Sequence, residues 1–94
     1  MKYYVIDDEQ PIVSALTVLL ESAGHEVKGF TSSVEALNLI KVDPPEIIIT
    51  DIMMPEMDGL ELCRRIRDIP EFANIRIIVL SAKTYEFDRS RARE

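Results

Sequence analysis

Short runs of β-branched residues alternate along this chain with stretches of helical periodicity, and this alternation narrows the choice of fold more than any other feature. Strand-like runs are expected near 2–6, 26–30, 46–50 and 75–80, and helices near 11–23, 33–41, 59–68 and 84–92. The connections are short, as in βαβ units. The 94 residues are therefore expected to form one α/β domain with a parallel sheet and helices on both faces.

Proline, glycine and serine residues mark the ends of several elements. Pro11 suits the first turn of the first helix, where a missing N–H costs nothing, and Gly24 is well placed to end that helix. Ser32 followed by Glu35 forms a capping-box pattern at the start of the second helix. Residues 46–50 are almost continuously apolar, which is typical of a strand covered on both faces.

The spacing of apolar residues predicts which side of each helix faces the sheet. In the first helix the residues that recur at helical spacing are Ile12, Leu16, Leu19, Leu20 and Ala23. In the third helix the roughly aligned residues are Leu60, Cys63 and Ile66. Both sets are expected to pack into the core.

Carboxylates follow two of the predicted strands. Asp7 and Asp8 come directly after the first strand, and Asp51 comes after the third. If the second strand flanks the first on one side and the third flanks it on the other, the chain reverses there, and open α/β sheets bind ligands at such a reversal. The three carboxylates would then converge and repel one another. Mg²⁺, a hard cation that prefers oxygen ligands, would resolve that repulsion.

Each acidic position has a simpler interpretation when it is taken alone. An Asp-Asp pair before a helix commonly caps the helix and compensates its dipole. An aspartate after a strand is commonly a turn residue. Both positions together, on strands that the topology makes adjacent, favour the metal-site interpretation.

Composition excludes several classes of function. A formal net charge of −6 argues against binding of nucleic acid or an anionic membrane by this chain, because both require a basic face. Cys63 is the only cysteine, so an internal disulfide is excluded and a reducing compartment is expected. The N-terminus lacks the pattern of a signal peptide, and no apolar stretch reaches the length of a membrane span. We expect a cytoplasmic location.

Three segments carry a resemblance to a known family: residues 5–9 (VIDDE), 48–59 (IITDIMMPEMDG) and 79–83 (VLSAK). In order and spacing they resemble the receiver domain of bacterial two-component response regulators, over the whole chain. The resemblance implies a flavodoxin-like strand order 2-1-3-4(-5). The chain ends at Glu94, before the fifth strand and fifth helix of that pattern.

The resemblance also implies a function and a set of site residues. It implies a switch that accepts a phosphoryl group from a histidine kinase or phosphotransfer protein onto Asp51. Asp8 would bind Mg²⁺ directly, Asp7 would help to hold the ion through water, and Asp51 and the backbone carbonyl of Met53 would be further ligands. Met53 would also contribute to the phosphoryl-binding site. Such a switch is not a classical enzyme, although weak autophosphatase activity would accompany it.

Four further residues receive roles: Ser81 and Ala82 from the same resemblance, and Pro55 and Gly59 from the conformational properties of proline and glycine. The Ser81 hydroxyl would donate a hydrogen bond to a phosphoryl oxygen and begin the switch, with the Ala82 backbone N–H nearby. Pro55 would stiffen the loop that presents the acceptor. Gly59 would permit a tight start to the third helix.

The sequence departs from the family pattern at its C-terminal end. Family members carry a lysine on the fifth strand that pairs with the phosphoryl group, and Lys83 lies in a different loop. The fourth strand, near 75–80, would also be left as an open edge. Two alternatives follow: a phosphorylation-incompetent fragment that acts through protein contacts or strand-mediated self-association, or a chain whose remaining residues are supplied separately.

Two other protein classes use related folds or chemistry. A haloacid-dehalogenase-like phosphatase would carry its nucleophile in an Asp-x-Asp motif after the first strand, whereas residues 7–9 read Asp-Asp-Glu. A flavodoxin-like binding protein would need a phosphate-cradling loop at that position, and three acidic residues repel phosphate.

Overall fold

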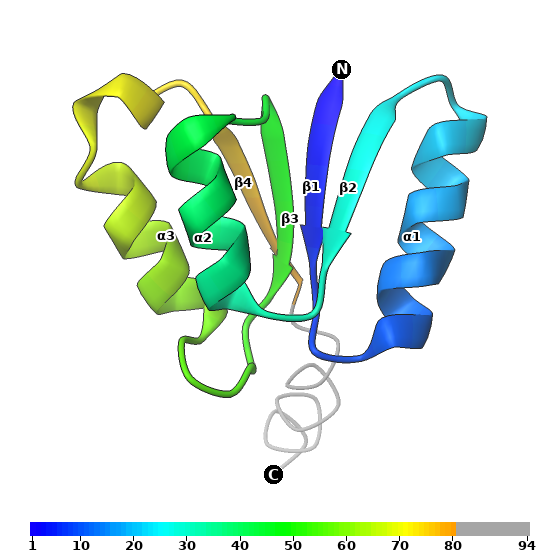
Figure 1. The fold of residues 1–94 in the computed structure, drawn as a ribbon, viewed down its shortest axis with the longest axis horizontal. Coiled ribbons are helices and arrows are strands. Elements are labelled where there is room, and N and C mark those ends of the chain that lie inside the picture. Colours follow the sequence, from blue (N-terminus) through cyan, green and yellow to red (C-terminus); the bar gives the residue numbers. More distant parts are fainter. Residues whose placement is uncertain (81–94) are drawn as a thin grey trace, which may run out of the picture.

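Four parallel strands pair in the order β2-β1-β3-β4 within residues 1–80, the part of the chain that the computed structural model describes (Figure 1). The strands are β1 (Lys2–Ile6), β2 (Glu26–Phe30), β3 (Ile47–Asp51) and β4 (Arg76–Leu80). The helices are α1 (Gln10–Ser22), α2 (Ser33–Val42) and α3 (Gly59–Arg67), followed by the short 3₁₀ helix η1 (Pro70–Phe72). The strand order confirms the predicted flavodoxin-like topology. The helix expected at 84–92 lies outside the described residues.

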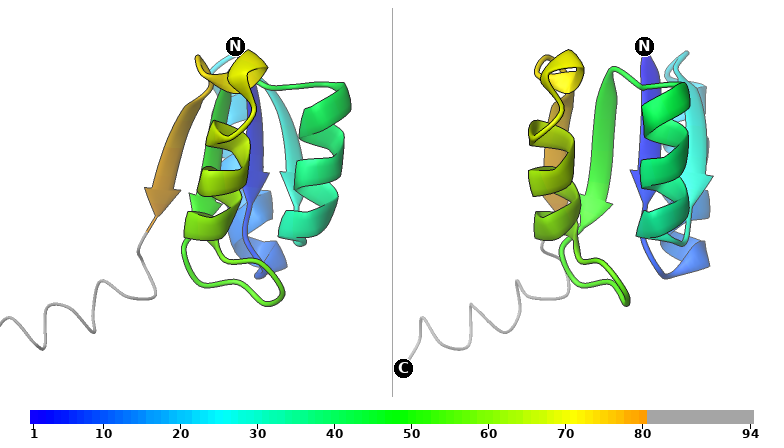
Figure 2. Two further views of the ribbon diagram at one scale, coloured as in Figure 1. Left: turned by 90° about the vertical axis from the view of Figure 1, so that its left-hand side faces the viewer. Right: turned by 60° about the vertical axis from the view of Figure 1, so that its left-hand side comes forward.

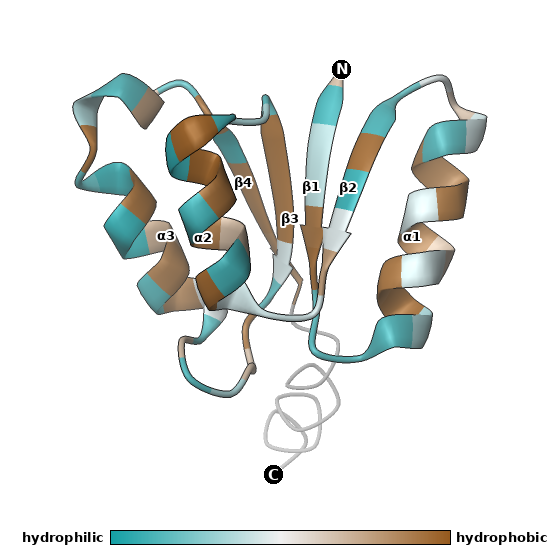
Figure 3. Cartoon of the chain, viewed as in Figure 1, coloured by the Kyte–Doolittle hydropathy of each residue, from teal (hydrophilic) through white to brown (hydrophobic). Residues whose placement is uncertain are grey.

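Helices cover both faces of the sheet. Helix α1 lies on one face, and α2 and α3 lie side by side on the other (Figures 1 and 2). Figure 3 shows β3 and β4 as largely hydrophobic strands and the β1–α1 turn as hydrophilic. The main core lies under α2 and α3, and its buried residues are Tyr4, Ile6, Ala36, Leu37, Ile40, Ile48, Met57, Leu62, Ile66, Phe72 and Ile75.

Strand β3 ends one residue later than the sequence predicted. Asp51 is the last strand residue and is in register with Leu80 of β4. The backbone N–H of Ile52 then donates to the Leu80 carbonyl at 3.1 Å. Asp51 is therefore held by the sheet itself, because ladder hydrogen bonds continue past it.

The buried face of α1 differs from the predicted one. Val13 is the buried residue of α1, whereas Leu19 is exposed. Gly29 of β2 explains the difference, because a Cβ atom there would collide with the Val13 side chain. The absent side chain lets α1 approach β2 closely, and this contact fixes the rotation of the helix around Val13. The expectations for Leu19 and Ala23, which are both exposed, were therefore wrong, whereas Ile12, Leu16 and Leu20 are partly buried.

The buried face of α3 also differs. Leu62 and Ile66 are buried, four residues apart on one side, whereas Leu60 is exposed and Cys63 is only partly buried. The first residue of α3, Gly59, packs against the backbone of Asp51. That contact sets the rotation of the helix, so Leu62 takes the core position expected for Leu60.

A polar cluster closes the edge of the sheet where the strands begin. The Lys2 ammonium pairs with Asp43, Lys28 approaches the same carboxylate at 3.7 Å, and the Tyr4 hydroxyl donates to the Asp43 carbonyl. The hydrogen bond from Lys2 lowers the pKa of Asp43, and the same bond raises the pKa of Lys2. Burial raises the pKa of Tyr4. These contacts tie the end of α2 to β1.

Within residues 1–80, no helix combines the length and the apolarity that a membrane span requires.

Candidate functional site

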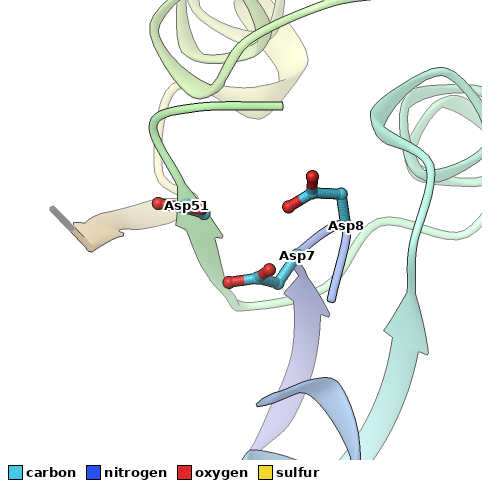
Figure 4. Close-up of side chains that lie close together, drawn as sticks. All are labelled: Asp7, Asp8 and Asp51. Atoms are coloured by element: carbon cyan, nitrogen blue, oxygen red, sulfur yellow. The ribbon is translucent and has the colours of Figure 1, made fainter. Parts of the chain in front are cut away.

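Three aspartates converge where β1 and β3 end side by side. Ile6 of β1 is in register with Thr50 of β3, so Asp7 and Asp51 occupy the next positions on neighbouring strands. Each of Asp7, Asp8 and Asp51 offers a carboxylate oxygen, and these oxygens lie within 4.8 Å of one another (Figure 4). Asp7 and Asp51 are 4% and 2% exposed, while Asp8 faces solvent. The site is thus anchored in the core and open on one side.

The β1–α1 turn places the first two aspartates. The Asp7 backbone N–H donates to the Phe30 carbonyl at 3.0 Å, and its Oδ1 accepts from the Glu9 N–H at 2.9 Å. The N-cap residue of α1 is Glu9, whose side chain makes no capping hydrogen bond. The N-cap position of α1 is therefore taken by Glu9 and not by Asp7 or Asp8.

The β3–α3 connection holds Asp51 from the other side. The Gly59 N–H donates to the Ile52 carbonyl at 2.8 Å and closes the base of the loop at residues 52–58. A Cβ atom on Gly59 would collide with the carbonyl oxygen of Asp51. Glycine is thus required here by close approach of two backbone segments and not by a positive φ.

The loop also forms one wall of an open depression of about 480 Å³ beside the aspartates. Its lining residues are Asp8, Ile52, Met53, Met54, Pro55 and Asp58. Both the loop and the β1–α1 turn lie at the lower edge of the sheet in Figure 1. The depression therefore lies on the Asp8 side of the acidic cluster and is open to solvent.

Asp58 contributes a feature that the sequence reasoning missed. Its Oδ1 accepts from the Glu61 N–H at 2.8 Å and caps α3, and its side chain also lines the depression. The signal was present, because aspartate followed three residues later by glutamate resembles a capping box.

The donor set fits a small, hard divalent cation. Carboxylate oxygens from two strand ends approach one another, and ionised carboxylates this close repel unless a cation lies between them. Mg²⁺ binds few protein carboxylates and keeps several waters, which suits a site open on one side. A carboxylate in such a site can also act as a nucleophile toward an anionic phosphoryl group, because the cation offsets their mutual repulsion.

The family model described as "Response regulator receiver domain" matches residues 4–94. The chain belongs to this family. The receiver domain is 36% identical over 88 residues to the alkaline phosphatase synthesis transcriptional regulatory protein PhoP of Bacillus subtilis (strain 168). That match covers 94% of this chain and 36% of PhoP, so the chain spans just over a third of that relative's length.

Solved structures show the same fold. The signal receiver domain of a signal transduction histidine kinase from Syntrophus aciditrophicus is 29% identical with a TM-score of 0.83, covering 99% of this chain and 70% of that one. A response regulator structure from Chloroflexus aurantiacus is 32% identical with a TM-score of 0.80, and the match covers 83% of this chain and 64% of that chain. Chemotaxis protein CheY4 of Vibrio cholerae is 25% identical with a TM-score of 0.79, and the match covers 95% of this chain and 78% of that chain.

Eight site residues were predicted from the sequence, and the structure describes six of them. Asp7, Asp8 and Asp51 come together, Met53 and Pro55 line the depression, and Gly59 packs behind Asp51. The remaining two, Ser81 and Ala82, lie outside the described residues. The role of each residue remains a prediction.

Proposed function

We propose that this receiver domain is a phosphorylation-dependent signalling switch in which Asp51 accepts a phosphoryl group and Mg²⁺ is the required cation. The observation that carries the proposal is the convergence of Asp7, Asp8 and Asp51 within 4.8 Å at the ends of β1 and β3. The proposed phosphodonor is a histidine kinase or a phosphotransfer protein, because membership of the receiver family points to two-component signalling.

The proposed transfer uses the chain's own carboxylates in separate roles. An Asp51 carboxylate oxygen attacks phosphorus in line, an O–P bond forms, and the P–N bond of the donor phosphohistidine breaks, leaving the neutral imidazole after it gains a proton. Asp8 would bind the cation directly, Asp7 would help to hold it through water, and Asp51 and the Met53 backbone carbonyl would be further ligands. Bound Mg²⁺ supplies charge neutralisation for the phosphoryl oxygens.

The buried position of Asp51 supports its role as the nucleophile, separate from the exposed ligand Asp8. Asp51 is held by ladder hydrogen bonds on the β4 side and by Gly59 on the α3 side, so its carboxylate needs little reorganisation before attack. Asp8 is exposed, so a hydrated cation arriving from solvent would reach its carboxylate without opening of the core. The proposed response to phosphorylation is a hydrogen bond from the Ser81 hydroxyl, with the Ala82 N–H nearby, that draws this segment toward the phosphoryl group.

The proposal includes a location and a reaction class. The chain is a switch and not a classical enzyme, and slow hydrolysis of the aspartyl phosphate would return it to the resting state. We place it in the cytoplasm, where its donor kinases act. With a net charge of −6, this chain is not proposed to bind nucleic acid itself.

A second candidate function is action through protein contacts without phosphorylation. Among the strands of residues 1–80, β4 pairs only with β3, and its central residue Ile78 is 47% exposed. An apolar edge strand is a template for pairing with another chain. This candidate predicts self-association or strand pairing with a partner through β4.

One experiment separates the two candidates. The protein is incubated with Mg²⁺ and acetyl phosphate, and its intact mass is recorded beside that of Asp51→Asn. A phosphoryl adduct that forms only in the parent, and only with Mg²⁺, supports the switch. A folded sample that shows no adduct under any condition would remove the switch and leave the contact function.

A further inference from the structure

The loop beside the acceptor contains a strained turn. Glu56 has a φ of 67°, a conformation that side-chain-bearing residues rarely adopt. The N–H of Met57 donates to the Pro55 carbonyl at 2.7 Å, which closes a three-residue γ-turn around Glu56. Turns of this hand are rare and strained, and such strain persists only where surrounding contacts hold it.

Two contacts hold the turn in place. The Met57 side chain is buried in the core under α2 and α3. The Ser33 hydroxyl, on the first residue of α2, donates to the Met57 carbonyl at 2.6 Å, and Ser33 is only 2% exposed. The turn is therefore clamped from its C-terminal side by a residue 24 positions earlier in the chain.

The hydroxyl of Ser33 is not needed to start α2. The N-cap is Ser32, whose side chain already accepts from the Glu35 N–H at 3.2 Å. The Ser33 bond instead crosses from α2 to the β3–α3 loop. A buried hydroxyl that reaches across two elements restrains their relative position, because breaking the bond leaves a buried polar group without a partner.

The clamp bears on the acceptor pocket because it fixes one end of a short segment. Ile52 is held at the other end, where its carbonyl accepts from the Gly59 N–H at 2.8 Å. Residues 53–56 span the interval between these two held points, and Met53, Met54 and Pro55 line the depression next to Asp8. The path of this wall depends on where Met57 is held.

We propose that Ser33 is a positioning residue of the acceptor pocket: its hydrogen bond to Met57 holds the strained turn at Glu56 and so places the Met53–Pro55 wall opposite Asp8. The proposal rests on the proposed function, since the wall matters for Mg²⁺ only if the carboxylates bind it. Ser33 acts through the loop and touches no reacting atom.

The test compares two serines at the start of the same helix. Ser33→Ala removes the clamp, and Ser32→Ala removes the N-cap without touching the loop. Mg²⁺ affinity is measured by calorimetric titration, and amide hydrogen exchange of Met57 is measured in metal-free protein. We expect Ser33→Ala to weaken Mg²⁺ binding by about 10-fold, the low end for loss of an outer partner of a metal site. It should also speed exchange at Met57. Ser32→Ala should leave both unchanged.

Equal effects of the two variants, or normal Met57 exchange in Ser33→Ala, would overturn the proposal. Unaltered Mg²⁺ affinity together with faster exchange would also overturn it, because the clamp would then be local to the turn. Failure of the parent protein to bind Mg²⁺ would instead refute the proposed function and, with it, the metal-directed part of the proposal. The exchange measurement would still decide whether Ser33 holds the turn.

Discussion

Gly59 packs so tightly behind Asp51 that a single added methyl group at position 59 would collide with the Asp51 carbonyl oxygen. The first turn of α3 and the last residue of β3 are thus one packed unit. The position of the proposed acceptor consequently depends on a residue that bears no functional group.

Gly59→Ala should disturb this unit. The added Cβ meets backbone atoms, which cannot move aside as a flexible side chain can, so we expect a loss of about 1–3 kcal/mol in the free energy of unfolding, typical of overpacking. Mg²⁺ affinity should fall as well. Urea denaturation and calorimetric titration measure the two effects. Gly24→Ala is the control, because its positive φ of 92° should make an alanine destabilising at the opposite end of α1, away from the β1–α1 turn. Should Gly24→Ala lower Mg²⁺ affinity equally, the specific link to Asp51 would be lost.

Asp8→Asn should have opposite effects on the metal-free protein and on the metal complex. Removing one of three converging charges relieves repulsion, so the metal-free variant should gain up to about 1 kcal/mol, the interaction of two unit charges ~4 Å apart in water. Mg²⁺ should then stabilise the variant less than the parent, because a ligand stabilises only the state that it binds. Thermal unfolding with and without Mg²⁺ measures both effects. A variant with an undiminished Mg²⁺ response would exclude Asp8 as a ligand.

The ion pair at the opposite edge should make stability depend on pH. The Lys2 hydrogen bond holds the pKa of Asp43 below its ordinary value of 3.8, so the ionised carboxylate stabilises the fold above pH 3.8 and this contribution is lost as the pH falls further. Lys2, whose pKa is raised above 10.5, loses its contribution only as the pH rises beyond that value. Asp43→Asn should therefore be less stable than the parent at neutral pH, with the difference vanishing in acid.

Chemical denaturation across the acidic range measures this difference. Lys2→Met is the matched variant, because it removes the other partner of the same pair and should reproduce the loss at neutral pH. A difference between parent and Asp43→Asn that stays constant from neutral to acidic pH would show that the pair contributes nothing through its charge.

The β4 edge should make the protein associate at high concentration. Ile78 is central in a strand that, in residues 1–80, has one partner strand, and a lysine there would place a charge on the open edge. Ile78→Lys should abolish the association. Val42→Lys, on the exposed end of α2, is the control for added charge. Sedimentation over a concentration series measures the effect. A parent protein that stays monomeric at the highest concentration would remove strand pairing as a function.

Much of the fold could be predicted because its signals are local. Pro11, Gly24 and the Ser32–Glu35 pattern mark element ends, and the structure places α1 and α2 close to the expected bounds. The meeting of Asp7 with Asp51 could also be anticipated, since parallel strands bring their carboxyl ends to one edge. The buried faces of α1 and α3 could not be predicted from the sequence, because each helix carries apolar residues on more than one side.

By itself, the sequence determined the alternation of strands and helices, because that alternation depends on local spacing of apolar residues. It also determined that acidic residues follow two strands, and the topology of a parallel sheet then brings those strand ends to one edge. Only the tertiary structure decided which helix faces are buried, since contacts at Gly29 and Gly59 set the rotation of α1 and α3. It also decided that Ser33 clamps the strained turn at Glu56. A hydrogen bond between residues far apart in sequence forms only when packing has brought them together, and no local pattern records it.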